Sequence, residues 1–416
     1  MNGKSVDNIT AFLVYTGSHE DPTTLASNLG IAFIGCDIKC QGFLFDDNDQ
    51  DASPISAMRN LLESGATYEK VLYPYMSGEE ILDDPRHAYK RWVINFGEME
   101  LEEASKWPLA LEIVRDKVQS ERLIKSKELA TWPWWRFWRT RRELYSSISG
   151  LSRMLVLSRV GDRLLFALVS TGIVVSEAVV VFASNRRSFL AAVQSRVHEV
   201  WTRLLASSLK DDVRYTPTDC FETFPFPAGV LEYKASDLST TVTTHVSRLE
   251  TVGGDYYEFR AALMIRNDEG LTKTYNRFHD PNEHSPDILE LRRLHALVDR
   301  AVLEAYGWDD LVKTATCEFL LDYEDDEDED DDVSPSRRQK KKPWRYRWPD
   351  DFRDEVLARL LELNKQRAEQ ECLTGIAAAA KQTGTKKGAG TKSKKSKTET
   401  SENASLFDSL DAGGDR

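Results

Sequence analysis

Arginine side chains interleaved with aromatic rings give this sequence its densest candidate chemistry. The tract from Thr131 to Leu144, TWPWWRFWRTRREL, contains five aromatic residues and four arginines. These arginines are Arg136, Arg139, Arg141 and Arg142. A guanidinium group binds phosphate, donates paired hydrogen bonds to guanine and stacks on aromatic rings. The tract is therefore either a stacking and phosphate-clamping surface or an aromatic core with an arginine rim.

The spacing of the tryptophans favours the second interpretation. Trp132, Trp135 and Trp138 lie at helical or turn-like spacing, which is typical of core residues that dock a helix. We therefore expect these rings to be structural and at least one arginine of the tract to contact DNA.

Positive charge is concentrated around this tract, although the chain as a whole is acidic. The 416 residues carry a net charge of -13, but residues 115–163 hold 12 basic and 5 acidic residues. A phosphate backbone responds to local charge, so this stretch, including Arg159 and Arg163, is the expected electrostatic footprint. The alternative is a solvated helical face.

A second group of candidate DNA contacts lies in a polar loop that follows a predicted helix. These candidates are Lys210, Arg214, Tyr215 and Thr216. Proline and aspartate residues of this loop prevent the helix from continuing, which leaves donor groups exposed along the loop. Such a loop can follow a DNA backbone.

The elements that position these residues are predicted to be three strands followed by a helix. The apolar run Leu164–Ala183 has the length of a membrane span. Its β-branched residues, and the break at Ser170–Gly172, instead favour two buried strands, 164–169 and 173–182, after a strand over 154–160. A stripe at Phe189, Val193, Val197 and Trp201 then predicts one helix packed on the sheet. We expect no membrane association.

Motifs in a fixed order link the chain to a known family. After FLFDD near Phe43 come LYPYMSGEEI from Leu72, RWVINFGEMELEEA from Arg91, the aromatic tract, RYTPTDCFETFPFP from Arg214, YNRFHDPNEHSPDILELRRLH from Tyr275, AYGW from Ala305 and KPWRYRWPDDFRDEVLARLLELNKQRAE from Lys342. Over roughly residues 1–371 the chain resembles the C-terminal target-recognition half of MmeI-like (type IIG/IIL) adenine-specific DNA methyltransferases of restriction-modification systems.

The resemblance implies DNA reading without catalysis. Such enzymes carry an upstream methyltransferase domain that binds S-adenosylmethionine and has an Asn-Pro-Pro-aromatic loop facing a flipped adenine. This chain contains no Pro-Pro dipeptide, and the glycine pair of GIAFIG, residues 30–35, is a weak cofactor signal. We therefore expect no catalytic residue and no cofactor in this chain. The expected partners are double-stranded DNA and a separate catalytic subunit that binds S-adenosylmethionine.

Cysteine and histidine usage gives little support to a metal site. The five cysteines are odd in number and scattered, which fits free thiols in a reducing compartment, here the cytoplasm. Cys36 and Cys40 lack a second ligand pair at zinc spacing. His279 and His284 flank a Pro-Asn turn, so we expect capping or surface histidines and no metal.

The predicted fold class is α+β: a mixed sheet-and-helix target-recognition domain, a flanking helical region and a disordered C-terminal tail. The expected organisation is a connector to a missing methyltransferase domain (1–60), the target-recognition domain (61–230), a helical region (231–320), a linker (321–343), a docking helix (344–372) and the tail (373–416). Ser285, Pro286 and Gly307 delimit one long helix. Ten carboxylates over Asp322–Asp332 predict a solvated spacer or, alternatively, an acidic mimic of DNA phosphates.

The function expected from the sequence is DNA recognition for a split or truncated adenine-specific methyltransferase of a restriction-modification or phage-defence system. Two alternatives remain open: a non-catalytic DNA-binding or assembly protein that competes with a full-length relative, and an inactive remnant. A remnant severed from its catalytic neighbour would expose an apolar interface and fold poorly.

Overall fold

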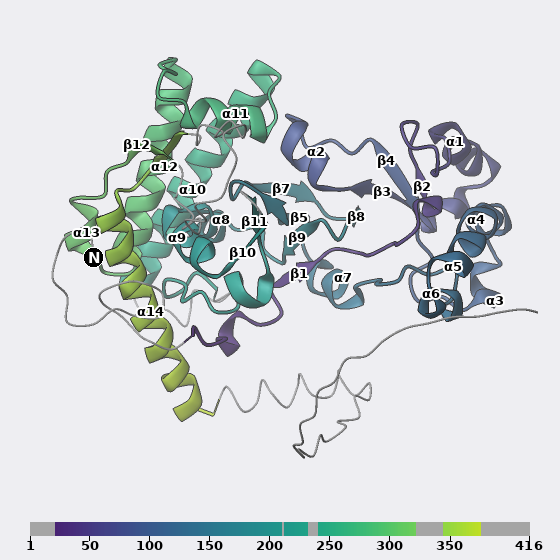
Figure 1. Cartoon of the computed structure of the whole chain (residues 1–416), viewed down its shortest axis with the longest axis horizontal. Helices are drawn as coiled ribbons and strands as arrows, with labels where there is room; N and C mark the ends of the chain where they lie inside the picture. The colour runs from purple at the N-terminus through teal and green to yellow at the C-terminus, as the bar shows by residue number, and fades with distance from the viewer. Residues whose placement is uncertain (1–20, 210–211, 232–239, 322–343, 376–416) are drawn as a thin grey trace, which may run out of the picture.

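Two lobes, each with its own hydrophobic core, lie side by side in the computed structural model (Figure 1). The structure describes residues 21–209, 212–231, 240–321 and 344–375. We call the lobe whose core lies mainly between Cys36 and Phe137 the small lobe, and the other the large lobe. The α+β class predicted from the sequence is confirmed. Lys210, the acidic segment 322–332 and the chain beyond residue 375 lie outside the described residues.

The small lobe is built on a four-stranded sheet of order β2-β4-β3-β8. Its strands are β2 (Leu44–Phe45), β3 (Leu72–Met76), β4 (Arg91–Ile94) and β8 (Val174–Val175). The first three pair antiparallel, whereas β8 returns from the middle of the chain and pairs parallel with β3. Helical segments surround this sheet: η2 (Gln41–Phe43), α1 (Ile55–Ser64), η3 (Ala66–Lys70), α3 (Leu101–Ala104), α4 (Pro108–Val114), η4 (Arg115–Gln119), α5 (Ser120–Lys125) and α6 (Lys127–Thr131).

The large lobe contains a second four-stranded sheet, of order β1-β9-β5-β7, in which all neighbours are antiparallel. Its strands are β1 (Ala32–Ile34), β5 (Arg153–Ser158), β7 (Phe166–Ser170) and β9 (Val179–Phe182). Because β5, β7 and β9 are almost completely buried, their sequences read as continuous apolar runs. Beside this sheet lies a small three-stranded sheet of β6 (Val160–Gly161), β11 (Asp212–Arg214) and β10 (Ser207–Leu209).

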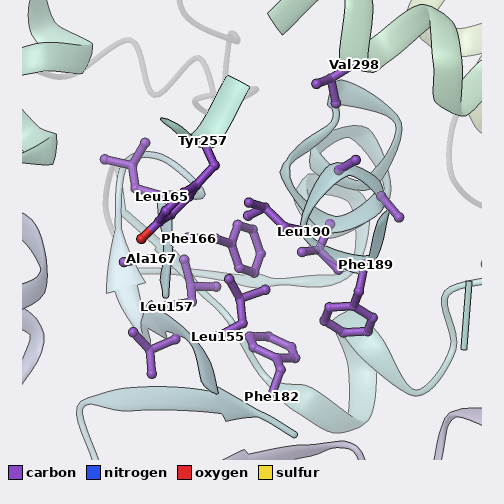
Figure 2. Close-up of a cluster of buried hydrophobic side chains, with 14 of the residues drawn as sticks. Leu155, Leu157, Leu165, Phe166, Ala167, Phe182, Phe189, Leu190, Tyr257 and Val298 are labelled. Carbon is purple, nitrogen blue, oxygen red and sulfur yellow. The ribbon is translucent and has the colours of Figure 1, made fainter. Parts of the chain in front are cut away.

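The helical segments of the large lobe pack on its sheet or on one another. They are η1 (Ala26–Asn28), α2 (Gly78–Asp83), α7 (Arg142–Ile148), α8 (Arg187–Gln194), α9 (Arg196–Leu205), η5 (Pro217–Phe221), α10 (Thr240–Asn267), α11 (Leu271–His279), α12 (Pro286–Ala305), α13 (Asp309–Val312) and α14 (Asp350–Leu373). Helix α8 packs on the sheet, and α10 packs against both α8 and α12. Figure 2 shows the core between α8 and the strands, where the ring of Phe182 contacts the rings of Phe166 and Phe189.

The three predicted strands are present, but the third one is divided between the two sheets. The range 173–182 was predicted as a single strand. It forms β8 and β9 instead, separated by a turn at Ser176–Ala178. Hydrophobicity alone conceals this break, because both halves are rich in buried valine. The turn lies where the two lobes meet.

The predicted helix after these strands is also divided. Ser195 is extended, with φ -65° and ψ 156°, and its hydroxyl accepts a hydrogen bond from the His198 N–H at the start of α9. The apolar stripe continues across the break, because α8 and α9 pack on the same core. The predicted long helix α12 is confirmed, with Pro286 at its first turn and Gly307 at φ +74° after its end. Ser285, however, accepts a hydrogen bond from Arg277 Nη2 rather than capping the helix with its side chain.

A pair of antiparallel strands, a C-terminal hairpin, precedes the last helix, although the docking helix was expected to begin at residue 344. Strand β12 (Glu318–Leu321) pairs with β13 (Trp344–Arg347), and α14 then packs against α9. The run Leu164–Ala183 forms strands, and no described helix has the length and apolar character needed to cross a bilayer.

Candidate nucleic-acid interface

The two lobes are joined by backbone pairing around the β8–β9 turn. The N–H of Ser176 donates to Met76 O in the small lobe (2.9 Å), and the N–H of Gly35, after β1, donates to Val179 O (3.0 Å). A Cβ atom on Gly35 would lie 2.2 Å from Ser176 O, so this close approach requires glycine. The turn is therefore held from both lobes, and Glu177 projects from its tip as an exposed residue.

Two arginines lie on the large-lobe side of this turn. Arg159 follows β5, and its backbone N–H donates to Ala178 O (2.8 Å). Strand β6 pairs Val160 with Arg214 of β11, and the N–H of Tyr215 donates to Arg159 O (2.8 Å). Burial lowers the pKa of Arg159, and the positive charges of Arg214 and Arg141 lower it further. Crowded cations of this kind favour an anion such as phosphate as their ligand.

More basic groups continue onto the small lobe. Arg139 is exposed, and its backbone pairs with Asp37, with N–H to O distances of 3.0 and 3.1 Å. Its guanidinium carbon lies 5.3 Å from the ring centre of Trp138. Lys39 Nζ pairs with Asp37 Oδ2 (2.7 Å), and Lys39 O accepts a hydrogen bond from Lys125 Nζ (2.9 Å).

These contacts define one continuous surface, which we call the basic strip. It consists of Lys125, Lys39, Arg139, Arg141, Arg159 and Arg214. Arg141 is half-buried within it, in the left-handed conformation at φ 55°, and its Nε donates to Gly35 O (3.1 Å). The strip thus connects α5 of the small lobe with β11 of the large lobe.

Glu177 is an acidic group inside the basic strip. Burial raises the pKa of its carboxyl, the negative charge of Asp37 raises it further, and Lys39 and Arg159 oppose this. A carboxylate repels phosphate, but it accepts a hydrogen bond from the amino group of cytosine in the major groove. The strip therefore combines cations suited to a phosphate backbone with one carboxylate suited to a base edge.

Several predicted contact residues make hydrogen bonds within the protein. Arg136 donates to the backbone oxygens of Met99 (2.8 Å) and Glu98 (2.7 Å), which fixes its guanidinium. Arg163 Nη1 donates to Asn276 Oδ1 (2.8 Å). Tyr215 is 1% exposed, and its hydroxyl lies 3.0 Å from Nε2 of buried His198. Tyr215 belongs to the core because its ring packs against the rings of Phe182 and His198.

The remaining predicted contacts occupy different positions. Arg142 directly follows Arg141 and is exposed at the first position of α7. Thr216 is half-buried, and its backbone oxygen accepts hydrogen bonds from the N–H groups of Asp219 and Cys220 at the start of η5. Of the ten predicted residues, the strip therefore brings together Arg139, Arg141, Arg159 and Arg214.

The tryptophans of the arginine tract are less buried than predicted. Phe137 is 1% exposed and is the tract's fully buried ring, where it meets Phe43 edge to face at 5.1 Å. Trp132 is 38% exposed and contacts Trp138 at 5.2 Å, whereas Trp135 donates its Nε1–H to Met99 O (2.9 Å). The tract is a tight turn rather than a helix, so its spacing does not direct these rings to one face.

The two predicted surface histidines differ from each other. His284 is exposed, but His279 is half-buried, and its Nδ1 accepts a hydrogen bond from the N–H of Tyr346 (3.0 Å) in β13. Burial lowers the pKa of His279, and nearby Arg163 lowers it further. Among the residues that the structure describes, no three His, Cys, Asp or Glu side chains are grouped to hold a metal ion, and all five cysteines are free thiols.

Sequence reasoning missed three members of the site. Lys125 lies inside the basic stretch 115–163 but was not named as a contact, and Lys39 lies outside that stretch. The hydrogen bond from Lys125 Nζ to Lys39 O brings the two lysines together. Glu177 was visible only as the single charge in an apolar run. This charge within an apolar run was the available signal, because a charged residue between two buried strands marks a turn.

Comparison with known proteins shows which family part of the chain resembles. The family model described as "MmeI, target recognition domain" matches residues 48–228. A solved structure of the Type IIL restriction-modification enzyme MmeI in complex with DNA is 16% identical, with a TM-score of 0.57, over 88% of this chain. The present chain covers 39% of that protein's chain, and at this identity the likeness concerns the fold. No match was found among curated proteins. The match over residues 48–228 confirms the resemblance to MmeI-like proteins that the sequence motifs carry.

Proposed function

We propose that this chain recognises a short sequence in duplex DNA through the basic strip. The observation that carries the proposal is the β8–β9 turn, which both lobes hold and which places Glu177 beside Lys39 and Arg159. Arg139 lies near Lys39, and Arg214 lies near Arg159. Cations on both sides can hold the phosphate backbones, while the carboxylate meets a base edge. The match to a target recognition domain over residues 48–228 supports this assignment.

The chemistry that follows recognition belongs to a partner in this proposal. By its likeness to MmeI-type enzymes, the partner is a separate catalytic subunit that transfers a methyl group from S-adenosylmethionine to the adenine amine, in a restriction-modification or phage-defence system. This chain selects the sequence and holds the duplex. Its domains would be a connector up to residue 60, the recognition domain over 61–230 and the helical region after it.

Selection of random duplex DNA on the purified chain tests this proposal. Salt near the physiological concentration suppresses phosphate binding that lacks sequence preference. We expect enrichment of one short motif by the chain alone or by the chain with its catalytic subunit. The double variant Arg159→Ala/Arg214→Ala should lose this enrichment, whereas the control Lys70→Ala, an exposed lysine of η3, should keep it.

Two results would overturn the proposal. One is a folded chain that enriches no motif, with or without a catalytic subunit. The other is enrichment that survives in the Arg159→Ala/Arg214→Ala variant, because DNA reading would then lie elsewhere on the surface.

A further inference from the structure

The end of helix α5 reverses the usual placement of polar and apolar residues. The continuous helical run α4-η4-α5 buries Leu111, Val114 and Val118 along one face, and the next position on that face is Arg122. Arg122 is 1% exposed, whereas the two apolar residues after it, Leu123 and Ile124, are 64% and 85% exposed. Single exposed leucines are ordinary, but an adjacent exposed pair beside a buried arginine is not.

Arg122 holds this orientation rigidly. Its Nη1 donates to Pro133 O and its Nη2 to Arg136 O, both at 2.8 Å, and its guanidinium carbon lies 5.4 Å from the ring centre of Phe43. This buried guanidinium cannot rotate outward without leaving the two carbonyl oxygens that accept from Nη1 and Nη2 unpaired. Leu123 and Ile124 are therefore fixed facing away from the lobe.

The helix then ends in a sharp corner. Residue Ser126 is extended, with φ -163° and ψ 155°, and its hydroxyl caps α6 by accepting from Leu129 N–H (3.1 Å). The residues on either side of Ser126, Lys125 and Lys127, are exposed. The apolar pair thus lies one turn before a corner with lysines around it.

This corner lies at one end of the basic strip. Lys125 is the residue directly after Ile124, and its Nζ donates to Lys39 O (2.9 Å), which connects the corner to Arg139 through Asp37. A duplex held along the strip from Arg214 toward Lys39 reaches the corner next. The patch consists of two apolar side chains surrounded by polar residues. Its area is far smaller than the roughly 800 Å² that each partner buries in a stable protein interface.

We infer that Leu123 and Ile124 form a wedge that inserts between base pairs of the bound duplex and bends it. This inference rests on the proposed function. Apolar side chains inserted from the minor groove unstack a base step and kink the DNA by about 20–90°. The anchoring by Arg122 supplies the stiffness that such a wedge needs, and Lys125 and Lys127 are placed to contact the flanking phosphates.

Energy transfer between dyes at the two ends of a short duplex measures the bend. The full chain is bound to a duplex containing the selected motif, or at low salt to an arbitrary duplex if no motif is enriched. We expect the native chain to shorten the end-to-end distance. The variant Leu123→Ser/Ile124→Ser should leave the DNA straight and weaken binding roughly tenfold, while Ile124→Leu should preserve the bend. Ile265→Ser, which changes a 46% exposed isoleucine of α10, is the matched control.

The outcomes separate the wedge from the proposed function. A bend of the same size in the Leu123→Ser/Ile124→Ser complex overturns the wedge, as does DNA that the native chain binds without bending. Both results would leave sequence recognition intact and assign the apolar pair to another partner. Failure of the native chain to bind any duplex, both alone and together with its catalytic subunit, overturns both proposals. Because both side chains are exposed, we expect the substitutions to leave the fold intact, and circular dichroism of each variant checks this.

Discussion

Arg345 of strand β13 donates hydrogen bonds from Nη1 and Nη2 to Oδ2 of Asp162, each at 3.2 Å, across a separation of 183 residues. Asp162 directly follows β6, the strand that pairs with β11 in the basic strip. Its backbone oxygen accepts from Arg203 Nη2 (3.1 Å), and its carboxylate also pairs with Arg163 (3.2 Å). The C-terminal hairpin thus holds the turn that positions Arg159 and Arg214.

Replacing Asp162 should loosen this turn and weaken DNA binding indirectly. The Asp162 side chain is 42% exposed, so solvent screening limits the loss in free energy of unfolding for Asp162→Ala to about 1 kcal/mol. We expect weaker binding of all sequences with an unchanged preferred motif, because no base contact is removed. Urea denaturation and DNA titration measure the two effects. Asp310→Ala, which breaks a surface pair with Arg359, is the control and should leave DNA affinity unchanged.

Glu177→Gln should change which sequence is selected. The carboxylate only accepts hydrogen bonds, whereas an amide also donates, so the preferred base pair opposite residue 177 should change with about 1–3 kcal/mol of lost discrimination. Because the pKa of Glu177 is raised, recognition by the native chain should weaken as the pH falls and the carboxylate becomes protonated. Selection of random duplexes by both proteins measures the change. An unchanged motif would assign base reading to other residues, and Glu79→Gln, an exposed glutamate of α2, serves as control.

Arg139→Ala should weaken binding to every duplex by the same factor. Arg139 is exposed at the middle of the strip and carries a charge suited to phosphate rather than to one base. Each lost phosphate contact lowers the slope of log affinity against log salt by about 0.9. Titrations at several salt concentrations measure that slope. A slope equal to that of the native chain would place Arg139 outside the interface.

The sequence predicted strands β5 and β7 well because burial on both faces leaves a plain apolar signature. It failed at 173–182, where the same valine-rich pattern serves two sheets and only pairing with β3 or β5 separates the halves. Local pattern also cannot show that Ser195 interrupts a helix, since the apolar stripe continues in register on both sides.

The candidate site was predicted only in part, because a local sequence pattern shows which residues are neighbours along the chain and not which are neighbours in space. Charge clustering identified Arg139, Arg141 and Arg159, which are close in sequence. It could not identify Lys39, which reaches them only through the Asp37–Arg139 backbone pairing. It also assigned Tyr215 to the surface, because polar neighbours in the chain do not reveal that its ring packs beside Phe182, at 6.0 Å between ring centres.

Arg122→Ala tests how firmly the corner of the small lobe is held. The substitution leaves the carbonyl oxygens of Pro133 and Arg136 without their donor and opens a cavity against Phe43. Each effect destabilises a folded protein, and together we expect a loss of about 2–4 kcal/mol in the free energy of unfolding. Urea denaturation measures it, with Arg115→Ala, an exposed arginine of the same helical run, as the control. A loss below that of the control would contradict the anchoring role.

Buried His198 should make the large lobe sensitive to acid. Burial lowers its pKa to about 3, from a value near 6.5 in the unfolded chain, so the folded state keeps it neutral. Below about pH 6.5 the unfolded state binds a proton that the folded state does not. The free energy of unfolding therefore falls as the pH drops, by up to about 1.4 kcal/mol per pH unit from this residue. Denaturation at pH 7, 6 and 5 should show a shallower fall for His198→Gln than for the native chain. His284→Gln, at an exposed position, controls for the substitution, and parallel pH profiles of native and His198→Gln proteins would show that His198 is not kept neutral in the folded state.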